Sequence, residues 1–128
     1  MYAGTDPEGN GVLVMDRRKE LKQLYKQMKP EMGIFLVQAL DDGRCYLQAT
    51  PDLKGAINST RFKLDAGWHP NRELQQAWQE RGAANFVFTV LDKLEYDKDE
   101  TKTDYSEELE ILRMVWEERL AQEKAVFF

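Results

Sequence analysis

Cysteine and histidine are almost absent from this chain of 128 residues, which has one of each, Cys45 and His69. One thiol cannot form an internal disulfide, and one thiol with one imidazole cannot supply the Cys and His ligands of a structural zinc site. Cys45 lies inside an apolar run, which predicts a small buried side chain. The sequence therefore excludes a disulfide scaffold and a zinc finger.

Long hydrophobic runs and an excess of positive charge are also missing. No apolar segment approaches the roughly 20 residues of a membrane-spanning helix, and the N-terminus lacks the basic-then-apolar order of a signal peptide, so we expect a cytoplasmic protein without a membrane partner. The net charge of −5 argues against a protein that coats nucleic acid with its whole surface, although it allows a local basic face. The composition, with 42% hydrophobic and 32% charged residues, is typical of one globular domain.

Two segments precede the first predicted strand. Residues 1–15 are rich in Gly, Asp, Pro and Asn and predict a flexible arm. Residues 16–30 predict a basic helix that begins at Asp16 and ends before Pro30. Its apolar stripe consists of Leu21, Leu24, Tyr25 and Met28. The opposite, lysine- and arginine-rich face is interpreted as a solvated surface, with phosphate contact as the alternative.

A β-hairpin is the strongest local signal in the chain. The runs Gly-Ile-Phe-Leu-Val-Gln-Ala-Leu and Arg-Cys-Tyr-Leu-Gln-Ala-Thr flank Asp-Asp-Gly within residues 33–50, which predicts two strands joined by a tight Asp-Gly turn. In the second run, Cys45, Leu47 and Ala49 alternate with more polar residues. The pattern predicts one buried face and places Tyr46 on the other.

The same periodicities predict the remaining elements. Leu53, Ile57 and Leu64 form the core stripe of one helix, and Asn71 caps a second that ends at Gly82 in a left-handed conformation. Asp104 and Glu107 have the spacing of a capping pair at the start of a last helix. The predicted ranges are helix 52–64, helix 71–82, a buried strand 86–91, a charged connection 92–103 and helix 104–123.

This order predicts an α/β domain of the α+β type, with a small three-stranded antiparallel sheet flanked by helices. The tail, residues 124–128, is apolar. We expect it either to fold back on the core or to cover a partner, and a homo-oligomer through this tail is one form of the second alternative.

Residues 31–123 resemble the GIY-YIG nuclease superfamily, in which a Gly-Ile-Tyr strand pairs with a Tyr-Ile-Gly strand and leads into a helix. Here the first motif is Gly33-Ile34-Phe35 and the second is Tyr46-Leu47-Gln48. The first motif is nearly kept and the second is altered. The resemblance implies a divergent, catalytically degenerate, bacterial member of a superfamily that cuts phosphodiester bonds.

The resemblance also implies where the site lies. The first-strand tyrosine falls on Phe35, the second is kept as Tyr46, and the glycine that closes the motif falls on Gln48. The phosphate-stabilising arginine falls on Ala56, and the residue one turn later on Thr60.

The metal-binding glutamate of the superfamily falls on Arg113, where a cation would repel a divalent metal. Glu110 and Glu117 share its helix face at i−3 and i+4. They are the metal ligands only if the protein is active, with Mg²⁺ as the cofactor; otherwise no cofactor is expected. His69, in a Trp-His-Pro-Asn turn, is interpreted as a packing or capping residue, with a catalytic role as the alternative. Trp68 is interpreted as a core residue, with ligand binding by an exposed ring as the alternative.

Three functions stay open from the sequence. The leading one is a nuclease-like domain that binds DNA or RNA without cutting it. The candidate contact residues for that function are Lys54, Arg61, Lys63, Arg72 and Arg113. The alternatives are a divergent metal-dependent endonuclease that uses Tyr46, and a protein-interaction module without nucleic acid, which the acidic last helix favours.

Overall fold

The computed structural model describes residues 29–128. The predicted arm, residues 1–15, and nearly all of the predicted basic helix, residues 16–30, lie outside the described residues. The described elements are β1 (Met32–Ala39), β2 (Cys45–Thr50), α2 (Leu53–Ala66), α3 (Arg72–Arg81), the 3-10 helix η2 (Ala83–Asn85), β3 (Phe86–Leu94) and α4 (Ser106–Gln122). The three strands form one antiparallel sheet, so the predicted fold class is confirmed.

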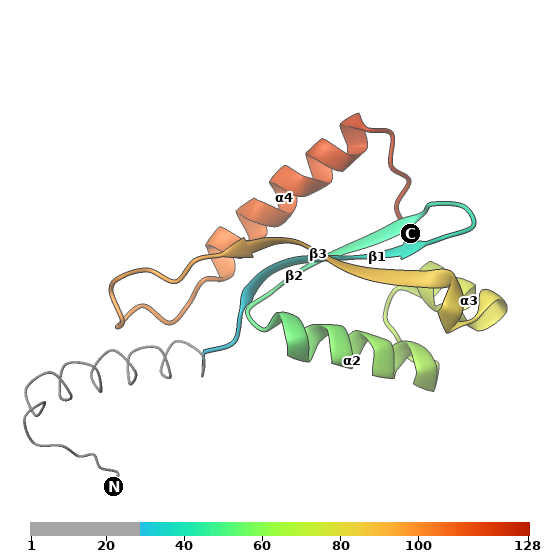
Figure 1. Ribbon diagram of the computed structural model, residues 1–128, viewed down its shortest axis with the longest axis horizontal. Coiled ribbons are helices and arrows are strands. Elements are labelled where there is room, and N and C mark those ends of the chain that lie inside the picture. Colours follow the sequence, from blue (N-terminus) through green and yellow to red (C-terminus); the bar gives the residue numbers. More distant parts are fainter. Residues whose placement is uncertain (1–28) are drawn as a thin grey trace, which may run out of the picture. The chain divides into compact units, whose positions relative to one another are not determined.

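Strand β1 lies at the centre of the sheet, between β2 and β3 (Figure 1). Every β1 residue except Gln38 is buried. Because successive side chains of a strand point to opposite faces, β1 supplies two cores. Phe35, Val37 and Ala39 belong to a core with α2 and α3, and Met32 belongs to a second core with Leu109 of α4. Helices α2 and α3 therefore cover one face of the sheet, and α4 covers the other (Figure 1).

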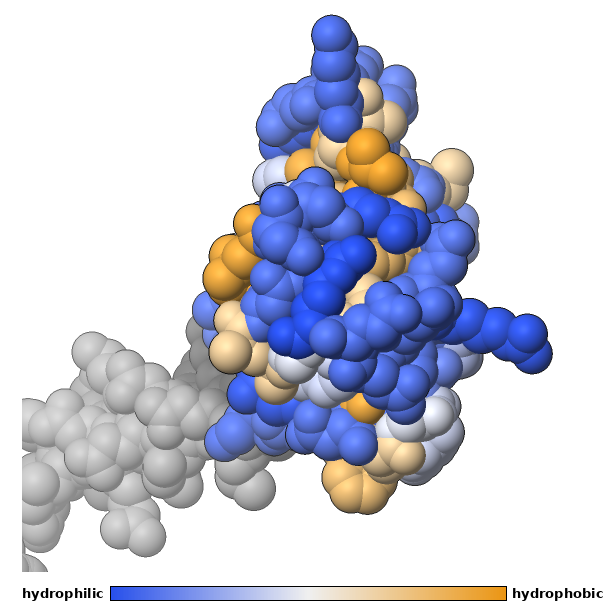
Figure 2. All heavy atoms as spheres, turned by 90° about the vertical axis from the view of Figure 1, so that its right-hand side faces the viewer, coloured by the Kyte–Doolittle hydropathy of each residue, from blue (hydrophilic) through white to orange (hydrophobic). Residues whose placement is uncertain are grey.

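The hairpin loop is wider than the predicted two-residue turn. Its four residues run from Leu40 to Gly43, because the Ala39 N–H donates to the Arg44 carbonyl at 2.9 Å and the Gly43 N–H donates to the Ala39 carbonyl at 3.0 Å. Hydrophilic side chains cover most of the end of the domain that carries this loop and α3 (Figure 2).

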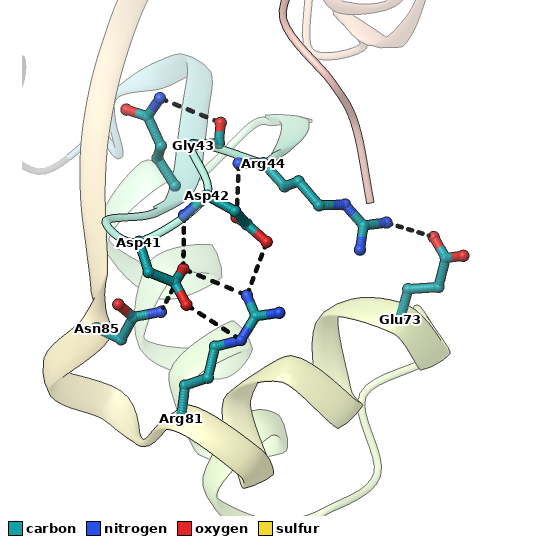
Figure 3. Close-up of polar contacts among 8 residues, drawn as sticks. Asp41, Asp42, Gly43, Arg44, Glu73, Arg81 and Asn85 are labelled. Carbon is teal, nitrogen blue, oxygen red and sulfur yellow. Dashed lines mark hydrogen bonds and ion pairs between the residues drawn. The ribbon is translucent and has the colours of Figure 1, made fainter.

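Ion pairs tie the hairpin loop to α3 (Figure 3). Arg81 contacts Asp41 at 3.2 Å and Asp42 at 2.9 Å, and Arg44 contacts Glu73 at 2.9 Å. The pKa of Asp42 lies below its ordinary value, chiefly because its carboxylate accepts the Arg44 backbone N–H and also faces Arg81. The two aspartates thus hold the loop against α3 through Arg81, and Asp42 also stabilises the turn through its bond to the Arg44 N–H.

Strand β3 differs from the prediction in length and burial. It continues to Leu94, three residues beyond the predicted end, and only Phe86 is buried among its nine residues. A continuous apolar run suggested a strand covered on both sides. Because β3 is instead an edge strand, Val87 and Val90 remain exposed.

The helix ends confirm one predicted cap and correct two others. The Asn71 side chain accepts the Leu74 N–H at 3.0 Å, as predicted. Gly82 has φ 86° and ψ 159°, a positive φ outside the left-handed helical region. Helix α4 begins at Ser106 after Tyr105, and Asp104 accepts the Ser106 N–H, so the predicted Asp104 and Glu107 capping pair is wrong.

The apolar tail folds back on the sheet. Cys45 pairs with Phe127 in a parallel bridge, its N–H donates to the Val126 carbonyl, and the Phe128 N–H donates to the Cys45 carbonyl, both at 2.9 Å. The Phe128 ring packs against the core beneath α2 and α3. Cys45 itself is buried, as predicted. The structure therefore shows the first of the two expected alternatives, a tail that folds back on the core, and not a tail that covers a partner such as a second copy of the chain.

Gly33, the first residue of the first motif, allows β3 to approach β1. A Cβ at this position would clash with the Asp92 carbonyl oxygen and lie 2.9 Å from the Lys93 Cα. The pairing of β1 with β3 shifts register between Ile34 and Phe35, immediately after this glycine. Since the clashing atoms belong to the backbone, they cannot move aside as a flexible side chain would. Gly33 has a packing reason to be glycine.

We expect Gly33→Ala to lower the free energy of unfolding by about 3 kcal/mol, the upper part of the usual range for overpacking, because β3 must shift. Urea denaturation measures the change. Gln38→Ala, at the exposed position of the same strand, is the control and should change stability by less than about 0.5 kcal/mol. Equal effects of the two substitutions would contradict the close approach.

Candidate functional site

Tyr46 lies on the face of β2 that α2 and α3 cover. The prediction that it lies on an uncovered, polar face is wrong, because helices cover both faces of the sheet. The half-buried Tyr46 ring packs against the core beneath α2 and α3 and meets the His69 ring edge-on, with 5.2 Å between the centroids and 88° between the planes. Its hydroxyl donates to the Gln48 Oε1 at 3.1 Å. Burial raises the pKa of Tyr46. The phenol is therefore neutral near pH 7, and its proton is already in a hydrogen bond.

Gln48 stands where the superfamily motif closes with glycine. Residues i and i+2 of a strand point to the same face, so the Gln48 side chain lies next to that of Tyr46 and accepts a hydrogen bond from the Tyr46 hydroxyl. The side chain fills space that a glycine would leave open in front of the phenol. A substrate oxygen that took the Tyr46 proton would first have to displace Gln48.

Phe35 is fully buried, and its ring stacks on that of Phe88 with 6.4 Å between the centroids and 19° between the planes. In the register of the hairpin, Phe35 pairs with Gln48 and Val37 pairs with Tyr46. Phe35 and Tyr46 are therefore diagonal neighbours on one face, the relation that the two motifs imply. The Phe35 ring itself belongs to the core.

Ala56 and Thr60 of α2 both turn towards the core. Ala56 is partly buried against it, and Thr60 is buried. The basic residues of the same helix lie elsewhere. The Arg61 guanidinium lies 4.5 Å over the Phe88 ring, towards the β3 edge, and the Lys63 Nζ lies 6.0 Å from the Trp68 ring. Lys54 is exposed, as is Arg72 at the start of α3.

His69 is held in place by hydrogen bonds to the loop and to α3. The His69 backbone N–H donates to the Gln75 Oε1 at 2.8 Å, and the Nδ1 of the His69 ring accepts the Asn71 backbone N–H at 3.0 Å. Because Nδ1 is an acceptor, the proton of the neutral ring is on Nε2. Burial lowers the pKa of His69, and the nearby Lys63 charge lowers it further. These contacts confirm the structural interpretation of this residue.

Gln75 was not singled out from the sequence. It is buried, and its Nε2 donates to the Leu64 carbonyl at 2.9 Å while its Oε1 accepts the His69 N–H. It thus joins α2, α3 and the loop between them. An isolated glutamine in a polar helix carries no signal for this role. The contact between His69 and Tyr46 is equally invisible in sequence, because it links a loop to a strand.

Arg113 lies on α4, against the sheet face opposite to the one that carries Tyr46. It contacts Glu110 at 2.6 Å and Glu117 at 3.3 Å, the two glutamates that the spacing places on its face of the helix. Hydrogen bonding to Glu110 is the main cause that raises the pKa of Arg113 and lowers that of Glu110. Because the carboxylates are exposed, the pairs contribute little stability.

The residues around Arg113 do not fit a divalent metal. The Arg113 guanidinium donates hydrogen bonds to oxygens of both glutamates. Because α4 covers the face of the sheet opposite to Tyr46, the structure does not bring Tyr46 together with Arg113, on which the resemblance places the metal-binding glutamate. Among residues 29–128, no group of three or more His, Cys, Asp or Glu side chains is arranged to hold a metal ion.

Solved structures of a homing endonuclease share this architecture. The catalytic domain of homing endonuclease I-TevI has a TM-score of 0.59 at 18% identity, covering 76% of this chain and 97% of that domain. A mutant of the catalytic domain of intron endonuclease I-TevI, with a glutamate replaced by alanine, has a TM-score of 0.60 at 17% identity, covering 77% of this chain and 92% of that one. At such identities the likeness concerns the fold.

The sequence matches no family model, and no curated protein matches it either. In the described part of the chain, no helix has the length and apolar character needed to cross a membrane.

We expect the His69 imidazole to titrate below pH 6.5, its ordinary value. Since the unfolded chain then holds the proton more tightly, the stabilisation is present above pH 6.5 and is lost as the pH falls through the lower pKa of the folded state. Because this is the only histidine, its ring signals in an NMR titration are unambiguous. A midpoint at or above 6.5 would contradict the burial of the ring.

We expect Tyr46→Ala to lower the free energy of unfolding by about 2 kcal/mol, below the range for a fully buried ring, because the Tyr46 ring is half-buried. Tyr46→Phe keeps the ring and removes only the bond to Gln48, so it should cost about 1 kcal/mol or less. Urea denaturation of both variants separates packing from hydrogen bonding. Unchanged stability in Tyr46→Ala would show that the ring does not contribute to the core.

Proposed function

We propose that this chain, which has the GIY-YIG fold, binds nucleic acid without cleaving it. The fold expected from the two hairpin motifs is confirmed by the likeness to the I-TevI catalytic domain, a GIY-YIG homing endonuclease. The single observation that carries the proposal is Ala56. Ala56 is partly buried against the core, and it is the residue that the resemblance aligns with the phosphate-stabilising arginine of the superfamily.

Cleavage of a phosphodiester develops negative charge that a cation must stabilise. The Ala56 methyl group supplies none, and Thr60, one turn later, is buried. Arg61 does not replace the lost arginine, because it extends over Phe88 towards the other edge of the sheet. Since catalytic residues that act as a unit fail together, these changes favour the loss of cleavage.

Charge is distributed unevenly between the two sides of the domain. Residues 51–82, which hold α2 and α3, contain five basic and four acidic residues, whereas residues 83–128, which hold β3 and α4, contain six basic and twelve acidic residues. An anionic ligand is therefore repelled less by the side that carries Tyr46 than by the other. Lys54, Lys63 and Arg72 are the proposed phosphate contacts on that side.

Arg113 is a weaker candidate for such a contact. It lies in the acidic half and already has carboxylate partners, so a phosphate would have to compete with Glu110 and Glu117.

A protein-interaction module is the second candidate, and one observation favours it. Ile111, Met114 and Val115 on the outer side of α4 are exposed. A helix with apolar residues on both sides is typical of one that is covered on both sides. This strip lies on the acidic side, away from Tyr46.

We expect the purified protein to bind labelled DNA or RNA in the presence of EDTA, with affinity that falls as the salt concentration rises. Lys54→Gln combined with Arg72→Gln should reduce the slope of log affinity against log salt by about two for duplex DNA, roughly one per lost phosphate contact. Fluorescence anisotropy measures both. The charge-matched control is Lys93→Gln with Lys124→Gln, outside α2 and α3, which should leave the slope unchanged.

The same preparation should leave linear, plasmid and branched DNA intact with Mg²⁺ or Mn²⁺. Metal-dependent cleavage that disappears in Tyr46→Phe would instead establish a divergent nuclease. Absence of binding to every nucleic acid would leave the protein-interaction module.

A further inference from the structure

Two large aromatic rings are exposed where α2 ends. Phe62 is 65% exposed and Trp68 is 57% exposed. They meet edge-on with 6.1 Å between the centroids and 88° between the planes. By contrast, Trp78 on α3 is only 5% exposed and donates its indole N–H to Asp65 at 3.0 Å. The core therefore accounts for Trp78, but it does not account for Phe62 and Trp68.

Phe62 and Trp68 lie on the solvent side of the candidate site that contains Tyr46 and His69. Tyr46 contacts His69, the next residue after Trp68, and the Lys63 charge acts on His69 while its Nζ lies 6.0 Å from the Trp68 ring. Tyr46, His69, Lys63, Trp68 and Phe62 thus lie near one another around the end of α2, and we call them the aromatic strip. One end lies at the retained motif tyrosine, and the other end is open to solvent.

We infer that the aromatic strip binds a single-stranded nucleic acid, with unpaired bases stacked on Trp68 and Phe62 and the phosphate backbone near Lys63. This inference rests on the proposed nucleic-acid binding and specifies its ligand. Exposed aromatic rings beside a cation are the features that single-strand-binding surfaces combine. A duplex presents its phosphates to Lys63 but keeps its bases stacked and paired, so the two rings would gain little from it.

The size of the patch decides against a protein partner here. The other large exposed apolar residues of the described chain lie on the hairpin loop, β3, α4 and the tail, so only two such residues occupy this position. A stable protein interface buries about 800 Å² on each side, more than two rings provide. Two rings match one or two bases.

The test measures the affinity of the whole protein for oligothymidine, for oligouridine and for a DNA duplex of the same length. We expect both single strands to bind more tightly than the duplex. Trp68→Ala and Phe62→Ala should each raise the single-strand Kd by roughly fivefold or more, the lower limit of what stacking on one ring contributes. Trp68→Phe should retain most of the affinity because it keeps an aromatic ring. Ile111→Ala, an equally exposed position on α4, is the control and should leave the Kd unchanged.

A second readout follows the indole directly. Oligothymidine should quench the emission of the wild type, and Trp68→Phe should abolish the quenching while retaining binding, because Trp78 is buried and Trp116 lies on α4 and donates to Asp92. Melting temperatures close to the wild type will show that the variants fold, as expected for exposed side chains.

The outcomes separate this inference from the function on which it rests. Binding to duplex and single strands with equal Kd, unaffected by Trp68→Ala and Phe62→Ala, would overturn the aromatic strip but leave the proposed nucleic-acid binding intact. Failure to bind any nucleic acid would overturn both. If oligothymidine binds but the tryptophan emission does not change, the bases do not stack on Trp68 and the inference is overturned. A preference of oligothymidine or oligouridine over the other would identify DNA or RNA as the source of the strand.

Discussion

The burial of β1 on both faces is the constraint on which the rest of the domain depends. This strand pairs with both neighbours and contributes Phe35, Val37 and Ala39 to one core and Met32 to the other. A shift of one residue in its register would exchange the two sets of side chains. Gly33 secures the register, because it allows the backbone of β3 to approach at the bulge. The first motif, Gly33-Ile34-Phe35, therefore has a role in packing the sheet as well as in the candidate site.

The residues at the altered motif positions pack on two different faces of the sheet. Tyr46, Ala56 and Thr60 lie between the sheet and α2, while Arg113 lies with Glu110 and Glu117 on α4. Ala56 and Thr60 pack well, Gln48 accepts the Tyr46 proton, and Arg113 is neutralised by its own helix. Each of these side chains is accommodated by its local environment. The stability of the fold therefore does not require the residues that the resemblance implies at these positions. Under the proposed function, the chain keeps a surface that binds nucleic acid but lacks the groups that stabilise the negative charge developed during phosphodiester cleavage.

The unequal charge of the two sides gives the domain a polarity that the net charge of −5 of the full chain conceals. The α2 and α3 side is nearly balanced and carries the exposed rings Phe62 and Trp68, whereas the α4 side is acidic and carries the exposed strip at Ile111 and Met114. An anion and an apolar partner would therefore meet different faces. The two candidate functions do not compete for one surface.

The sequence by itself determined the class of the fold, the hairpin, the helix over Leu53 and Leu64 with its Asp52 start, and the Asn71 cap, because these depend on neighbours a few residues apart. It also identified Tyr46 and the altered motif positions through their resemblance to the superfamily. The tertiary structure decided that β3 is an exposed edge, that α4 begins after Tyr105, that the tail pairs with Cys45, and that His69 meets Tyr46. The opposite placement of Tyr46 and Arg113 also came only from the structure. Each of these depends on which elements share a face or an edge, and that choice is made by contacts between residues far apart in the chain, which local periodicity does not encode.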